Sequence, residues 1–128
     1  MHEVFILAGA RTAIGAFQGV FRDQPAPKLG ARAIAGALQR AGVAPADLQQ
    51  VYMGCVLAAG IGQAPARQAT LGAGCPDSTG AITFNKVCGS AMRAVMSAAN
   101  DLRCGDFSLV AAGGMESMSQ APYLAVGV

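Results

Sequence analysis

The stretch AITFNKVCGSAMRAVMSAANDLRCGDFSLVAAGG, residues 81–114, decides the fold of this chain. Residues 81–87 are rich in β-branched and aromatic side chains, and residues 107–114 form a second apolar run, so both predict strands. Between them, residues 89–105 place their polar side chains on one narrow stripe: Ser90, Arg93, Ser97, Asn100 and Asp101. That spacing predicts a helix that is mostly buried. A strand, a helix and a strand in succession indicate a parallel βαβ unit.

The residues before this unit continue the same alternation. Residues 3–10 (EVFILAGA) and 47–57 predict two further strands. Residues 28–41 predict a helix that ends at Gly42, and residues 64–74 predict a short helix. The fold class is therefore α/β, with a mostly parallel sheet of four strands that is covered on both faces.

Composition narrows the classes of function. The 128 residues are 53% hydrophobic and only 12% charged, which is about half the usual charged fraction, so a partner or further chain is expected to cover part of the surface. The basic residues are scattered and the net charge is +2, which does not favour nucleic-acid binding. Apolar runs fall short of the roughly 20 residues that a membrane helix needs, and no signal peptide is recognisable, so we expect a cytoplasmic protein.

The four cysteines differ in position. Cys88 lies between the predicted strand 81–87 and the following helix, where the helix N-terminus favours a reactive thiolate. This position alone leaves a nucleophile and a core side chain equally open. Cys104 lies near the opposite end of that helix and is expected to be inert, while packing explains Cys55 in a strand and Cys75 before a proline. No CxxC pair occurs and His2 is the only histidine, so neither a metal site nor a permanently bound cofactor is expected.

Glu116 is the other candidate for chemistry, within GGMESMS, residues 113–119. It follows a predicted strand, and α/β folds bind ligands at the carboxyl ends of parallel strands. A single glutamate is nevertheless more often a structural hydrogen-bonding group, which remains the preferred interpretation. The residue pattern assigns no residue to substrate binding.

Four segments together resemble the thiolase family: residues 3–17, 54–74, 85–102 and 110–124. NKVCGSAM, GQAPARQ and GGMESMS are most similar to the acetyl-CoA C-acetyltransferase group of that family. The resemblance implies a three-layer α/β/α half-fold whose sheet has five strands, four of them in this chain. It also implies an incomplete amino-terminal domain over residues 1–118, and the start of a coenzyme A-binding loop region at 119–128.

The same resemblance implies acyl transfer from coenzyme A thioesters. Cys88 would carry the acyl group as a thioester, either in the Claisen condensation of two acetyl-CoA molecules or in thiolysis of a 3-ketoacyl-CoA. Its backbone N–H would stabilise the oxyanion. The family's activating histidine, asparagine and second cysteine come from motifs absent here, so the chain alone is expected to be inactive. Strand 81–87 would pair with its copy in a homodimer or tetramer.

Three alternatives remain open from the residues. One is a noncatalytic assembly module that keeps the half-fold, and another is a condensing enzyme of the ketoacyl-synthase type. The third is a redox-sensing thiol protein that uses Cys88.

Overall fold

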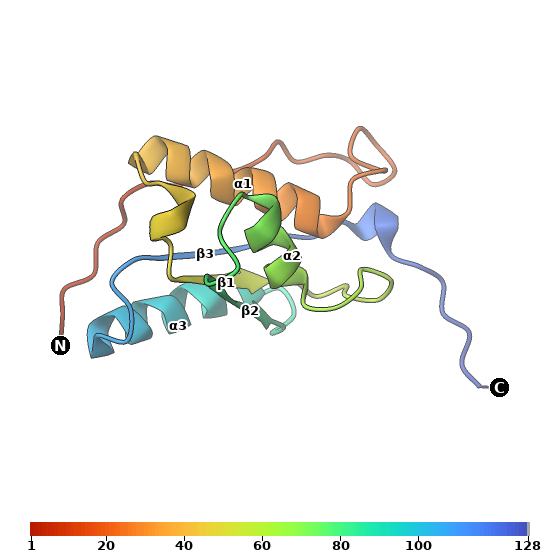
Figure 1. Ribbon diagram of the computed structural model, residues 1–128. Helices are drawn as coiled ribbons and strands as arrows, with labels where there is room; N and C mark the ends of the chain where they lie inside the picture. Colours follow the sequence, from red (N-terminus) through yellow and green to blue (C-terminus); the bar gives the residue numbers. More distant parts are fainter. Residues whose placement is uncertain (128) are drawn as a thin grey trace.

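The computed structural model describes residues 1–127 and contains one parallel sheet of three strands (Figure 1). The strands are β1 (Gln50–Gly54), β2 (Gly80–Phe84) and β3 (Val110–Gly114), and their order in the sheet is β2-β1-β3. Gly54 pairs with Phe84 on one side and with Gly114 on the other. All three strands therefore end together at one edge of the sheet.

Helices cover both faces of this sheet. Helices α1 (Ala26–Ala41) and α2 (Pro65–Gly72) lie on one face and α3 (Ser90–Cys104) lies on the other (Figure 1). Two short 3-10 helices, η1 (Pro45–Asp47) and η2 (Met118–Gln120), complete the regular structure. The α/β class and the three-layer arrangement expected from the sequence are thus confirmed.

Strand β1 lies at the centre and is buried along its whole length. Val51 and Met53 belong to the core under α1 and α2, whereas Tyr52 packs with Ala94 and Ala98 of α3. Successive side chains of a strand point to opposite faces, so this single strand supplies both cores. The near-continuous apolar run of residues 51–53 is the sequence signature of such a doubly covered strand.

A partly buried hydrogen bond ties α3 to the sheet. The Tyr52 hydroxyl donates to the Asp101 carboxylate at 2.5 Å. Burial and the neighbouring carboxylate raise the pKa of Tyr52, because both disfavour the phenolate. The polar stripe predicted on this helix therefore has a member that faces the sheet rather than solvent.

Hydrogen bonds fix one end of α1 and one end of α2. Gly42 has φ 67° and donates its N–H to carbonyls of the last turn of α1, as predicted for a helix stop. At the start of α2 the Ala66 N–H donates to the Thr83 hydroxyl of β2 at 3.0 Å, so a neighbouring strand caps this helix. Arg67 donates to the carbonyls of Asp77 and Thr79 and anchors the loop before β2.

The prediction of a strand at residues 3–10 is wrong. This segment has no regular structure and runs from the end of α3 to α1. At one end the His2 N–H donates to the Arg103 carbonyl, and at the other the Arg40 side chain donates to the Gly9 carbonyl. Its apolar side chains are exposed, Ile6 to 90%. A strand needs a neighbour for its backbone hydrogen bonds, and no strand in residues 1–127 pairs with this one. Residues 1–127 therefore contain three strands rather than four.

The prediction of a mostly buried α3 is also wrong. Only Ser90, Ala94 and Ala98 of this helix are buried, while Met92 is 72% and Met96 is 52% exposed. One side of the helix packs on the sheet, and nothing else in residues 1–127 covers the other side. Apolar periodicity reports which side chains could be buried, and it does not report what covers them.

Candidate active site

Cys88 sits in a tight turn between β2 and α3, and its side chain is exposed. Val87, the preceding residue, has φ 49°, which is an uncommon backbone conformation for a β-branched side chain. Such local strain is found where surrounding contacts impose it, often at functional sites. The turn therefore presents Cys88 at the start of α3, as the sequence predicted.

Hydrogen bonds hold this turn in its strained conformation. The buried Ser90 hydroxyl accepts the Lys86 N–H at 2.8 Å and donates to the Val87 carbonyl at 2.6 Å. The Val87 N–H in turn donates to the Asn85 side-chain oxygen at 3.1 Å. The Ser90 side chain thus fixes the backbone on both sides of Val87, the residue that precedes the thiol.

Two glycines allow α3 to begin close to the sheet. A Cβ on Gly54, the last residue of β1, would lie 2.6 Å from the Ala91 backbone nitrogen. A Cβ on its register partner Gly114 would lie 2.7 Å from the Ala91 Cβ. Sequence reasoning missed this role, although a glycine inside the predicted strand 47–57 and another at the end of the predicted strand 107–114 are signals of close backbone approach.

A cavity of about 570 Å³ opens where the three strands end. Its wall combines the ends of β1 and β3, the Cys88 turn and the segment after β3, and it includes Val56, Leu57, Cys88, Glu116 and Met118. Among the described residues lining this cavity, Cys88 and Glu116 are the ionisable ones. The two residues that the sequence singled out therefore lie in one site.

Glu116 is anchored by backbone groups of the loop after β1. Its carboxylate oxygens accept the N–H groups of Val56 and Leu57, each at 3.0 Å, and the Cys55 thiol lies 3.7 Å away. The structural role preferred from the sequence is present, and it occurs inside the cavity rather than away from it.

The other cysteines lie outside the cavity. Cys55 is 1% exposed, and burial together with the Glu116 carboxylate raises the pKa of its thiol to about 11. Burial also raises the pKa of Cys75. Cys104 is exposed at the far end of α3, roughly 20 Å along the helix from its start. His2 lies beside Gly105 at that same far end, so it is not part of the site.

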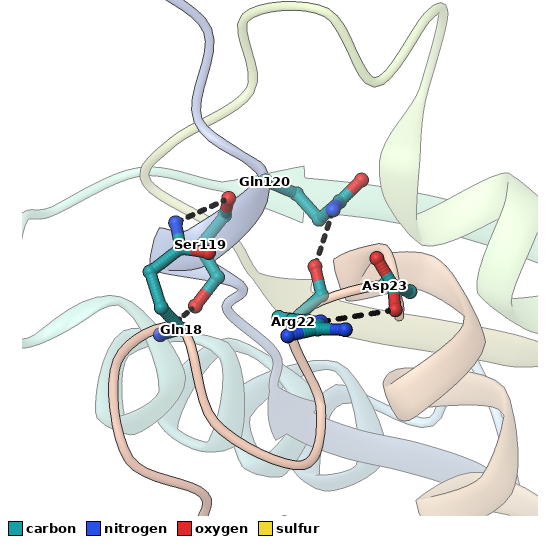
Figure 2. Close-up of polar contacts among 5 residues, drawn as sticks. All are labelled: Gln18, Arg22, Asp23, Ser119 and Gln120. Carbon is teal, nitrogen blue, oxygen red and sulfur yellow. Dashed lines mark hydrogen bonds and ion pairs between the residues drawn. The ribbon is translucent and has the colours of Figure 1, made fainter.

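The loop before α1 also borders the site, because it contacts residues 117–120. Figure 2 shows the Gln18 N–H donating to the Ser119 hydroxyl at 2.8 Å and the Gln120 side chain donating to the Arg22 carbonyl. The Ser117 hydroxyl donates to the Gln24 carbonyl at 2.7 Å. These contacts fasten the loop before α1 onto the segment that carries Glu116, and a smaller cavity of about 280 Å³ lies between them.

Within the described part of the chain, no three His, Cys, Asp or Glu side chains come together in a way that could hold a metal ion. None of the helices in residues 1–127 has the length and apolar character that crossing a membrane requires.

Comparison with known proteins identifies relatives of the whole chain. Residues 4–127 match the family model described as thiolase, N-terminal domain. The chain is 52% identical to the mitochondrial acetyl-CoA acetyltransferase of Mus musculus over 97% of its length, and 53% identical to the acetyl-CoA acetyltransferase of Cupriavidus necator over 99%. It covers 29% and 32% of those proteins, so it spans about a third of the length of its curated relatives.

A solved structure agrees with these sequence matches. The Acat5 thiolase from Ascaris suum, in complex with coenzyme A, superimposes with a TM-score of 0.93 at 35% identity. The match covers 97% of this chain and 33% of that one. From the family match and the shared fold together, we conclude that this chain belongs to the thiolase family.

Proposed function

We propose that the protein transfers acyl groups between coenzyme A and the Cys88 thiol. The observation that carries this proposal is the position of Cys88. It is the one cysteine among the four that lines the cavity where all three strands end, and it lies at the start of α3. The free N–H groups and partial positive charge of a helix N-terminus suit the negative charge that develops on the attacked thioester oxygen.

The reaction would proceed in two steps through a thioester on Cys88. The thiolate attacks the carbonyl carbon of an acyl-CoA, a new S–C bond forms, and coenzyme A leaves as a thiol after taking up a proton. In the condensing direction, the α-carbon of a second acetyl-CoA loses a proton and attacks the acyl group. A C–C bond then forms as the S–C bond to Cys88 breaks, and Cys88 leaves as a thiolate; thiolysis of a 3-ketoacyl-CoA runs both steps in reverse. The Cys88 N–H would donate to the oxyanion, a contact typically worth a few kcal/mol.

Names of the relatives support the substrate class. Those in mouse and Cupriavidus necator are acetyl-CoA acetyltransferases, and the Ascaris suum thiolase was solved with coenzyme A. The cavity beside Cys88 is lined by apolar side chains such as Val56, Leu57 and Met118, which suit a short acyl chain. We therefore assign acetyl-CoA and acetoacetyl-CoA as substrates, with coenzyme A thioesters bound transiently and no permanent cofactor.

The proposal extends to the arrangement of the complete protein. Residues 1–118 would form the amino-terminal domain and residues 119–128 would begin the coenzyme A-binding loop region. Strand β2 is an edge of the described sheet, and its continuation to Val87 is exposed, which supports pairing with a second copy in a homodimer or tetramer. We retain a cytoplasmic location as part of the proposal, although the vertebrate relatives are named as mitochondrial.

Trapping the acyl-enzyme tests this function. The full-length gene product is incubated with acetyl-CoA, quenched in acid and digested, and the mass of each cysteine peptide is measured. We expect one acetyl group on the Cys88 peptide and none in Cys88→Ser. Cys104→Ser is the matched control because Cys104 is the other exposed cysteine, and it should keep the label. Acetyl groups on Cys104, or on no cysteine, would contradict the proposal and favour a redox or assembly role.

A further inference from the structure

Glu116 is an ionisable side chain of the cavity that the reaction proposed for Cys88 does not use. We infer that Glu116 is a positioning residue, which holds the backbone of residues 55–57 as one wall of the cavity beside Cys88. This inference rests on the proposed function, because it assigns Glu116 a part in shaping that same site.

The contacts of Glu116 are of the kind that fix a backbone. Its two carboxylate oxygens accept hydrogen bonds from consecutive N–H groups, those of Val56 and Leu57. Hydrogen bonds to a charged acceptor are about twice as strong as neutral ones. Val56 and Leu57 also contribute to the cavity wall. A shift of this loop would therefore change the shape of the space next to the thiol.

This loop supplies the backbone hydrogen-bond donors of the Glu116 carboxylate. The ion pairs within residues 1–127 join Arg22 to Asp23 and Arg67 to Asp77, and neither involves Glu116. A half-buried carboxylate without a cation needs N–H donors to offset its loss of water. The N–H groups of the loop thus stabilise the carboxylate, and the carboxylate in turn holds the loop in place.

Gln49 makes an equivalent contact at the opposite end of the same two strands. Its side-chain oxygen accepts the consecutive N–H groups of Ser108 and Leu109, at 2.7 and 3.1 Å. Gln49 precedes β1 and holds the start of β3, whereas Glu116 follows β3 and holds the residues after β1. Gln49 lines neither cavity. The two residues therefore share a structural task, and only Glu116 performs it beside Cys88.

The experiment compares these two residues in the full-length gene product. Glu116→Ala, Glu116→Gln and Gln49→Ala are prepared, and thermal unfolding, kcat and KM for acetoacetyl-CoA thiolysis are measured. We expect Glu116→Ala to lower kcat about ten- to a hundredfold, because small misplacements in an active site have effects of that size. Glu116→Gln should be intermediate, since its amide oxygen can accept one N–H while its NH₂ group cannot accept the other.

Gln49→Ala should unfold at a lower temperature and keep the kcat and KM of the unsubstituted protein. An unchanged kcat in both Glu116 variants, or an equal loss in Gln49→Ala, would overturn the positioning role. If Glu116→Ala does not fold, the nearly isosteric Glu116→Gln decides the question by the same comparison.

Labelling of Cys88 with iodoacetamide separates this inference from the proposed function. We expect labelling to be severalfold faster in the Glu116 variants than in Gln49→Ala, because the wall is released and a negative charge leaves the cavity. The buried Cys75 should stay unlabelled, which shows that the protein remains folded. Absence of a Cys88 thioester in the unsubstituted protein defeats the proposed function alone. Equal Cys88 labelling in all the proteins defeats the positioning role alone.

Discussion

At the scale of single residues, Gly54 and Gly114 determine how deeply α3 approaches the sheet. They are register partners, and added side chains at both would collide with Ala91 in the first turn of the helix. Cys88 precedes that turn, so its height above the strand ends depends on two residues that carry no functional group. Their contribution is steric, because interiors have little free space to accept a methyl group.

Replacing Gly114 with alanine tests this steric requirement. The new Cβ would lie 2.7 Å from the Ala91 Cβ, and we expect the free energy of unfolding to fall by about 1–3 kcal/mol through overpacking. Gly113→Ala is the matched control on the same strand, because its Cβ would meet Met53 sulfur at an ordinary 3.6 Å. Urea unfolding of both variants measures the difference. Equal stability of the two would show that α3 shifts freely.

The buried Cys55 thiol makes stability depend on pH. Its pKa is raised from 9.0 to about 11 by burial and by Glu116, so the folded state favours the neutral thiol. This contribution is fully present below pH 9 and is lost as the pH rises through about 11. Unfolding of Cys55→Ala should therefore be less sensitive to pH over that range. The residual decline belongs partly to Tyr52, whose pKa is also raised. An unchanged pH dependence would contradict this assignment.

At the scale of elements, β2 combines two roles. Thr83 caps α2 through its hydroxyl, whereas Ile82 is 42% exposed at the edge of the described sheet. The Thr83 hydroxyl of β2 thus contributes to the fold, whereas the free edge of the strand is available for pairing. Any test of pairing must leave Thr83 intact, because its loss would also unsettle the start of α2.

A charge on this edge should prevent pairing between copies. We expect Ile82→Lys in the full-length gene product to shift the proposed dimer towards monomer, because a lysine on an edge strand blocks edge-to-edge contact. Leu71→Lys is the matched control, since Leu71 is an equally exposed apolar residue at 41% that lies on α2. Sedimentation velocity measures both. A monomer shift in both variants, or in neither, would contradict the interface.

At the scale of the whole molecule, large apolar side chains are exposed in several segments, and two of these segments bear on what covers the chain. One is the outer side of α3 with Met92 and Met96, and the other is the segment of residues 3–10. Residues 3–10 find no strand neighbour in residues 1–127. Exposed apolar patches of this kind mark surfaces that bind other protein.

The 128-residue chain by itself should reveal this surface. We expect it to show the far-ultraviolet circular dichroism of an α/β protein, to bind a dye specific for apolar surface, and to catalyse no acetoacetyl-CoA thiolysis. Replacing Ile6 and Met92 with lysine should reduce dye binding, because both side chains are exposed. Measurable thiolysis by this chain alone would contradict the requirement for groups beyond it.

The sequence by itself determined the features that depend on neighbouring residues. Periodicity identified the three helices, Gly42 marked the end of α1, and the junction of strand and helix placed Cys88. Resemblance of linked segments identified the family. Each of these signals is local, because helix and strand periods and end residues act over a few positions.

Only the tertiary structure decided which backbone groups meet across long separations. It joined Glu116 to the loop 59 and 60 residues earlier, brought Gly54 and Gly114 side by side, and left residues 3–10 without a strand partner. A main-chain N–H that donates such a hydrogen bond carries no side-chain signature, and a glycine that allows close packing does not identify the segment that approaches it. The proposed nucleophile was therefore visible in the sequence, and the wall beside it was not.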